Sequence, residues 1–151
     1  MVKDQITADL KQAMLAGDTQ RVTVLRGLKT VIQYAEVAAG KREEGLPDQE
    51  VITLLQKESK KRQDSADLYA NAGEQARSEA ELSEKVIIDG YLPKQLSEAE
   101  VALVVDEVIA ELGAADVKQL GQVIAGVRAK TAGSADGAII ARLVKAALTN
   151  Q

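Results

Sequence analysis

Apolar residues recur every three or four positions along almost the whole chain, the spacing that gathers them on one face of an α-helix. The first segment shows this pattern with Ile6, Leu10 and Met14. Only 2% of the residues are aromatic, so a core must be built from Leu, Ile, Val and Ala. Such a core suits closely packed helices better than sheets. We therefore predict an all-α protein.

Helix-breaking residues divide this pattern into seven predicted helices. Glycines end most of them: Gly17, Gly40, Gly73, Gly113 and Gly133. The third helix is predicted from about Asp48, just after Pro47, to Asn71. Ser97 and Glu100 have the spacing of a capping box at the fifth helix, and Ser134 is expected to cap the seventh. The fifth helix is predicted to bury Val101, Val104, Val105, Val108, Ile109 and Leu112.

The helical pattern breaks most clearly at Gly90 and Pro93, because the residue before a proline disfavours helix. We therefore predict an N-terminal four-helix part, residues 1–90, followed by a smaller C-terminal three-helix domain, residues 96–151. The linker is placed at about residues 91–95.

The absence of histidine and cysteine excludes imidazole bases, thiolate nucleophiles and disulfides. The sequence also has no G-x-S-x-G nucleophile elbow and no G-x-x-x-x-G-K phosphate loop. We predict no catalytic residue, no metal and no cofactor. No apolar run resembles a signal peptide or a membrane span, so we expect a cytoplasmic protein without a membrane partner.

A basic ridge lies in the middle of the third predicted helix, where residues 57–65 contain no apolar residue: Lys57, Lys60, Lys61 and Arg62. One interpretation is a solvated helix face, in which charges are balanced at i+4 positions such as Asp64. The other is a binding surface, since the stretch has no apolar anchor for packing.

The C-terminal stretch, residues 113–151, has a net charge of +3, whereas residues 1–92 have −3 and residues 93–112 have −4. Its candidate RNA-binding residues are Arg128, Lys130, Ser134, Gly137, Arg142 and Lys145. The loop 133–137 reads either as a helix stop and cap or as an anion site at a helix start. Arg128 and Lys130, near the end of the sixth helix, also offset its dipole, which is the other interpretation of these cations. The acidic fifth helix is expected to point away from bound RNA.

Several strings, spread in order over nearly the whole chain, resemble the GatB/YqeY family. They are Val24-Leu-Arg-Gly-Leu-Lys29, Lys61-Arg-Gln-Asp-Ser65, Tyr91-Leu-Pro-Lys-Gln-Leu-Ser-Glu98, Leu120-Gly-Gln-Val-Ile124 and Gly133-Ser-Ala-Asp-Gly137. The last string departs from the family pattern Gly-Arg-Ala-Asp-Gly, because Ser134 stands where the family has arginine.

The resemblance implies a two-part helical fold and a relation to the tail domain of GatB, the component of glutamine-dependent aspartyl/glutamyl-tRNA amidotransferase whose tail contacts tRNA. That enzyme is a carbon–nitrogen ligase with glutamine as amido-N-donor, and its catalytic domains have no counterpart in this sequence. The leading hypothesis is therefore a tRNA-binding accessory protein that is not catalytic on its own. The alternative is a helical module that binds a protein partner and no nucleic acid.

Overall fold

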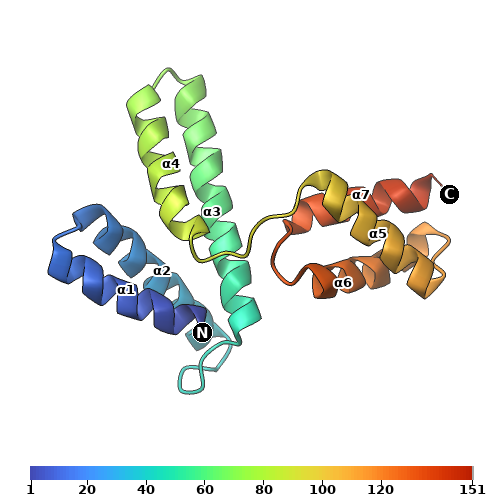
Figure 1. Ribbon diagram of the computed structural model, residues 1–151, viewed down its shortest axis with the longest axis horizontal. Helices are drawn as coiled ribbons and strands as arrows, with labels where there is room; N and C mark the ends of the chain where they lie inside the picture. Colours follow the sequence, from blue (N-terminus) through green and yellow to red (C-terminus); the bar gives the residue numbers. More distant parts are fainter. Residues whose placement is uncertain (151) are drawn as a thin grey trace. The chain divides into compact units, whose positions relative to one another are not determined.

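The computed structural model describes residues 1–150, and in this part of the chain it contains only helices, turns and loops (Figure 1). The helices are α1 (Val2–Ala16), α2 (Thr19–Ala38), α3 (Asp48–Asn71), α4 (Gln75–Asp89), α5 (Glu98–Leu112), α6 (Leu120–Thr131) and α7 (Gly137–Thr149). A short 3-10 turn, Val117–Gln119, precedes α6. The prediction of an all-α protein is confirmed.

The chain divides into two compact units, residues 1–92 and 93–151. Helices α1 to α4 belong to the first unit and α5 to α7 to the second. Tyr91 and Leu92 pack against the core of the first unit. Leu96, after the boundary, belongs to the second unit, where its amide donates to the Ser134 carbonyl at 2.7 Å. That each unit folds as an independent domain stays a prediction.

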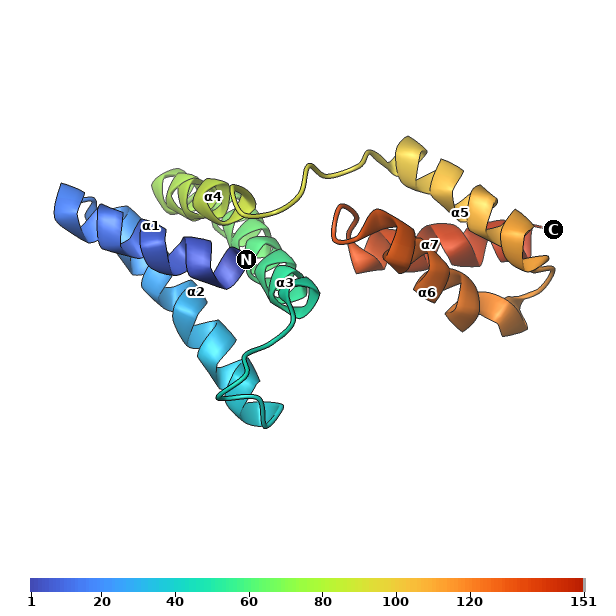
Figure 2. The ribbon, with the colours of Figure 1, turned by 60° about the horizontal axis from the view of Figure 1, so that its bottom comes forward.

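In the first unit, α1 packs against α2 and α3 packs against α4, as two helical hairpins (Figures 1 and 2). The buried core consists of Ile6, Val24, Leu25, Leu28, Ile32, Val51, Leu55 and Ile88. Met14, predicted on the apolar face of α1, is 53% exposed, and Ala13 is buried instead. The reason is the helical period, which rotates position 14 away from Ile6 and brings position 13 back to its face.

The polar middle of α3 packs against α4. The Ser59 side chain is buried and its hydroxyl donates to the Asp89 carboxylate, to which the Lys85 ammonium also donates, at 2.6 Å. Arg62 forms ion pairs of 3.1 and 3.2 Å with Glu81 and Glu84 of α4. Hydrogen bonds and ion pairs therefore join this hairpin where apolar contacts are missing.

The second unit is a three-helix bundle of α5, α6 and α7. Its core consists of Val101, Val105, Val108, Ile109, Ala114, Val123, Val127, Ala135, Ile140, Val144 and Leu148. Helices α5 and α6 approach closely at Gly126, where an added Cβ would lie 2.7 Å from a methyl group of Val108. Glycine at this position is therefore a packing requirement.

Two predictions for the second unit are wrong in detail. Leu112 is 48% exposed rather than buried, because it is the last residue of α5 and no helix covers that end. Ser134 does not cap α7. Its hydroxyl donates to the Thr131 carbonyl at the end of α6, while Asp136 is the N-cap of α7. The capping box of Ser97 and Glu100 is confirmed.

Candidate nucleic-acid interface

Lys130, one of the predicted RNA contacts, is paired within its own unit. Its ammonium lies 2.7 Å from the Glu107 carboxylate and 2.6 Å from that of Glu111, both on α5. Hydrogen bonds to Glu107 and then Glu111 raise the pKa of Lys130 above its usual value. The charge of Lys130 is thus balanced by two carboxylates before any ligand binds.

Arg142 on α7 is also paired, with Glu98 at the start of α5. Both side chains are 58% exposed, and an exposed ion pair of this kind contributes little and exchanges readily. Lys145, one turn further along α7, is exposed and has no ion pair within residues 1–150. Of these two cations, Lys145 is the one available to an external anion.

Acidic α5 therefore belongs to the same bundle as the cations of α6 and α7. Residues 93–151 contain six Lys and Arg and seven Asp and Glu, a net charge of −1. The acidic residues 93–112 and the basic residues 113–151 are separate in the sequence but pack in one unit. Helix α5 packs with the basic helices, because Glu98, Glu107 and Glu111 hold two of their cations. That α5 points away from bound RNA stays a prediction.

Arg128 lies over the first residue of α7. A Cβ built on Gly137 would be 2.9 Å from a guanidinium nitrogen of Arg128, so glycine leaves the space that this side chain occupies. Arg128 is exposed and has no ion pair within residues 1–150. The start of a helix carries a partial positive charge and free N–H groups. Two positive sources therefore meet at one exposed point, an arrangement that favours an anion there.

The loop before α7 already places one carboxylate at the start of the helix. The Asp136 carboxylate accepts a 3.0 Å hydrogen bond from the Ala138 amide. The Ser134 hydroxyl is used at the end of α6, as described above, and so does not point to a ligand. Ser134 thus shapes the loop, and Arg128 is the cation that lies at the start of α7.

The basic ridge of α3 is divided between paired and unpaired cations. Lys61 lies 3.1 Å from the Glu58 carboxylate, and Arg62 is held by α4. Lys57 and Lys60 have no ion pair within residues 1–150. Because carboxylates surround half of this ridge, it is a weaker anion-binding surface than its sequence suggests.

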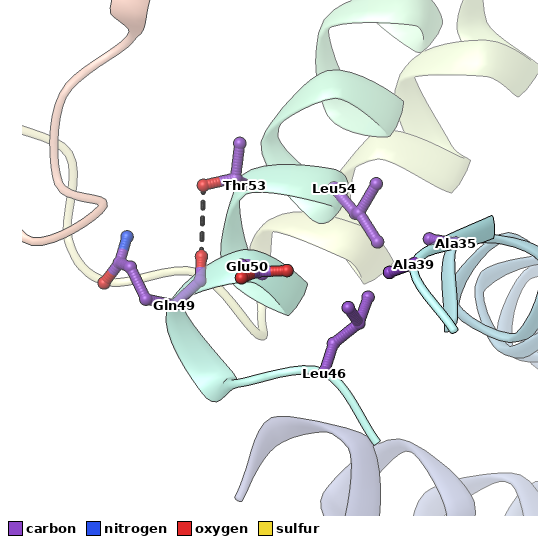
Figure 3. A pocket seen from close by; sticks show the side chains of 7 residues that line it. All are labelled: Ala35, Ala39, Leu46, Gln49, Glu50, Thr53 and Leu54. Atoms are coloured by element: carbon purple, nitrogen blue, oxygen red, sulfur yellow. Dashed lines mark hydrogen bonds between the residues drawn. The ribbon is translucent and has the colours of Figure 1, made fainter. Parts of the chain in front are cut away.

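A pocket of about 270 Å³ opens between α2 and α3 in the first unit (Figure 3). It is lined by Ala35, Ala39, Leu46, Gln49, Glu50, Thr53 and Leu54. The Thr53 hydroxyl donates to the Gln49 carbonyl, at 3.0 Å, and the Glu50 carboxylate lies 3.9 Å from Lys41. The lining therefore offers apolar contacts, one carboxylate and a hydroxyl that is bonded to its own helix.

Neither metal ligands nor a membrane span emerge from the described part of the chain. Among residues 1–150, no three Asp or Glu side chains are grouped so that they could hold a metal ion. Over the same residues, no helix combines the length and the apolar character required to cross a membrane.

Sequence reasoning named Arg128 and Gly137 separately but missed that they touch. It also missed the partners of Lys130, although Glu107 and Glu111 have the i,i+4 spacing that places two carboxylates on one helix face. That spacing is the signal that could have predicted a paired lysine on the neighbouring helix.

A comparison with known protein families supports the YqeY part of the sequence resemblance, and the relation to GatB stays a prediction. No curated protein sequence matches the chain. The family described as Yqey-like protein matches residues 3–148, nearly the full length. The match spans both units, including the loop that carries Gly137 and the helix that carries Arg128. On this coverage, the chain belongs to the Yqey-like protein family.

Proposed function

We propose that this protein is a non-catalytic accessory protein that binds tRNA, with its main phosphate contact at the start of α7. The observation that carries the proposal is the exposed Arg128 guanidinium over Gly137, unpaired within residues 1–150 and next to a helix start. Lys145, exposed on α7, provides a second cation in the same unit. Arg142 contacts the RNA phosphates as well once its exposed ion pair with Glu98 opens.

The choice of tRNA rests on the resemblance of the sequence to the tail domain of GatB in the tRNA amidotransferase. Folded RNA is recognised through its phosphates and shape, which requires cations and hydrogen-bond donors rather than exposed stacking aromatics. The same resemblance supports a role beside a glutamine-dependent tRNA amidotransferase and a cytoplasmic location, where such substrates are found. Nothing in the pocket or the loop supports a reaction of the protein's own.

Titration of the full chain with unfractionated tRNA, at 50 and 200 mM salt, tests the proposal. Each neutralised phosphate contributes a slope of about −0.7 to −0.9 in log K against log salt. Arg128, Lys145 and Arg142 should by themselves contribute a slope of about −2. Absence of tRNA binding at the lower salt concentration would overturn the proposal.

The second candidate function is a helical module that binds a protein partner. The apolar pocket between α2 and α3 favours it, because four of its seven lining residues are Ala or Leu. Binding of a partner there would bury apolar surface and would change little between the two salt concentrations. A salt-insensitive complex that Leu54→Ala weakens, without any tRNA affinity, would favour this candidate instead.

A further inference from the structure

Helix α2 carries no acidic residue between Thr19 and Ala35, although the unit that contains it has a net charge of −3. Over that length it holds three cations, Arg21, Arg26 and Lys29. A helix of 20 residues in a protein with 23 carboxylates would ordinarily carry several. This local charge is therefore opposite in sign to that of the unit around it.

The buried face of α2 is made by Val24, Leu25, Leu28, Ile32 and Glu36, which pack toward the neighbouring helices. Helical spacing places a different set on the opposite side: Thr23, Arg26, Gly27, Thr30, Gln33 and Tyr34, all of them exposed. Hydroxyl, amide and guanidinium groups dominate this set, which we call the outer face of α2.

The cations near the outer face are available. Arg21 lies 3.9 Å from the Asp9 carboxylate of α1 and is partly engaged. Arg26 is exposed and Lys29 is half-buried on the flank, and neither has an ion pair within residues 1–150. The acidic residues of α2 and its N-cap are both engaged, because Glu36 is buried and held 2.6 Å from Lys3 and Asp18 accepts from the Arg21 amide.

The outer face is also open to a close approach of a ligand backbone. A Cβ added at Gly27 would meet no atom within 4 Å, so the glycine is not required by packing. Next to Arg26, its missing side chain exposes helix backbone. The hydroxyls of Thr23 and Thr30 donate to carbonyls one turn earlier, at 3.0 Å each, so they can accept from a ribose hydroxyl, while the exposed Gln33 amide can donate to a phosphate.

We propose that the outer face of α2 is a second phosphate-contacting surface of this protein, and that its ligand is RNA. Arg and Lys with Thr, Gln and Tyr are the side chains that most often contact phosphate and sugar. A protein partner fits less well, because Tyr34 and Val37 are the only large exposed apolar residues of this helix. The proposal rests on the proposed tRNA binding and extends it to the first unit.

A matched pair of charge insertions tests the surface without removing a packed residue. Thr30→Glu places a carboxylate in the outer face of α2, and Thr7→Glu places one on α1. Both threonines are exposed in helices, and each hydroxyl donates to the carbonyl four residues earlier. Glutamate favours helix more than threonine does, so neither change should unfold the helix. Circular dichroism checks that both variants keep their helicity.

With unfractionated tRNA as the probe, Thr30→Glu should bind roughly tenfold more weakly than the parent, whereas Thr7→Glu should bind as the parent does. The double variant Arg26→Ala/Lys29→Ala should lower the salt slope by about 1 to 2. Its control, Lys41→Ala/Lys85→Ala, removes the same charge from less exposed cations paired with Glu50 and Asp89 and should leave the slope unchanged.

The outcomes separate the two proposals. If Thr30→Glu and Thr7→Glu bind tRNA equally well while Arg128→Ala weakens binding, the α2 surface is wrong and the proposed function stands. If the Arg26/Lys29 variant loses no more affinity than its control, the α2 surface is likewise overturned. A parent protein that binds no tRNA at low salt overturns both proposals.

Discussion

The hydroxyl of Tyr91 donates a 2.6 Å hydrogen bond to the Asp9 carboxylate, joining the segment after α4 to α1 across 82 residues of sequence. The same carboxylate accepts from the Gln5 amide, at 2.9 Å, and lies 3.9 Å from Arg21. Burial first, and the bond to Asp9 second, raise the pKa of Tyr91 to about 12. This contact anchors the end of the first unit on its first helix.

The Tyr91 contact predicts a loss of stability in alkali. The folded pKa, about 12, lies above the unfolded value of 10.0, so between these pH values the folded state holds more protons than the unfolded state. The stabilisation is therefore complete below pH 10 and is lost as the pH rises toward 12. The free energies of unfolding of the parent and of Tyr91→Phe, measured with urea from pH 8 to 11.5, should therefore converge as the pH rises.

At neutral pH, Tyr91→Phe should lower the free energy of unfolding by about 1 kcal/mol, the usual loss for one hydrogen bond. Arg21 and Gln5 remain beside the Asp9 carboxylate in this variant. A difference between parent and variant that stays constant over the whole pH range would contradict the role given to the hydroxyl.

The close approach of α5 and α6 predicts that a single methyl group destabilises the second unit. Gly126→Ala would place its Cβ 2.7 Å from the buried, β-branched Val108 side chain, which has little rotamer freedom in a helix. We expect a loss of about 1 to 2 kcal/mol by thermal or urea unfolding.

Gly121→Ala, on the same helix, is the control, because nothing lies within 4 Å of its added Cβ. This variant should be neutral or more stable by about 0.5 kcal/mol. Equal stabilities of the two variants would show that the helices are not in contact at Gly126.

The segment between the units predicts a single preferred tryptic site. Tyr91 and Leu92 pack on the first core, and the Gln95 side-chain amide donates to the Gly133 carbonyl, at 3.2 Å. Lys94 is exposed between them. Limited trypsin digestion should therefore cut first after Lys94 and give fragments 1–94 and 95–151, identified by mass spectrometry. First cuts within residues 57–62 would contradict the predicted division into domains.

The sequence predicted local structure well where one residue decides it. Pro47 and Gly73 bound α3 at the predicted Asp48–Asn71, and the Ser97–Glu100 capping box starts α5. It failed where tertiary contacts decide. The partners of Lys130 depend on which helix lies opposite. The errors at Met14 and Ser134 are local, since they concern the phase of α1 and the residue at which α7 begins.

For the candidate site, too, the sequence predicted the residues but not their tertiary contacts. The cations themselves could be read from the sequence, and all lie on the predicted helices. Which of them are free could not, because Glu107 and Glu111 approach Lys130 from 23 and 19 residues away. The contact of Arg128 with Gly137 likewise requires the turn between α6 and α7 to be known.

Replacing Ser134 by arginine should raise the affinity for tRNA. Ser134→Arg adds a cation in the loop before α7, at the position where the resembled family has arginine. We expect tRNA binding to strengthen severalfold and the salt slope to become steeper by about 1. Ser134→Ala removes the same hydroxyl without adding charge and is the control. If both variants bind tRNA equally, the loop does not face the RNA.

The comparison of Arg128→Ala with Lys130→Ala tests the central claim most directly. The two substitutions remove the same charge from one helix, two residues apart, but Lys130 is held by Glu107 and Glu111 and Arg128 is not. In tRNA titrations at 50 mM salt, Arg128→Ala should weaken binding roughly tenfold and lower the salt slope by about 1, whereas Lys130→Ala should change both little. Equal losses in the two variants, or no loss in Arg128→Ala, would contradict a phosphate contact at the start of α7.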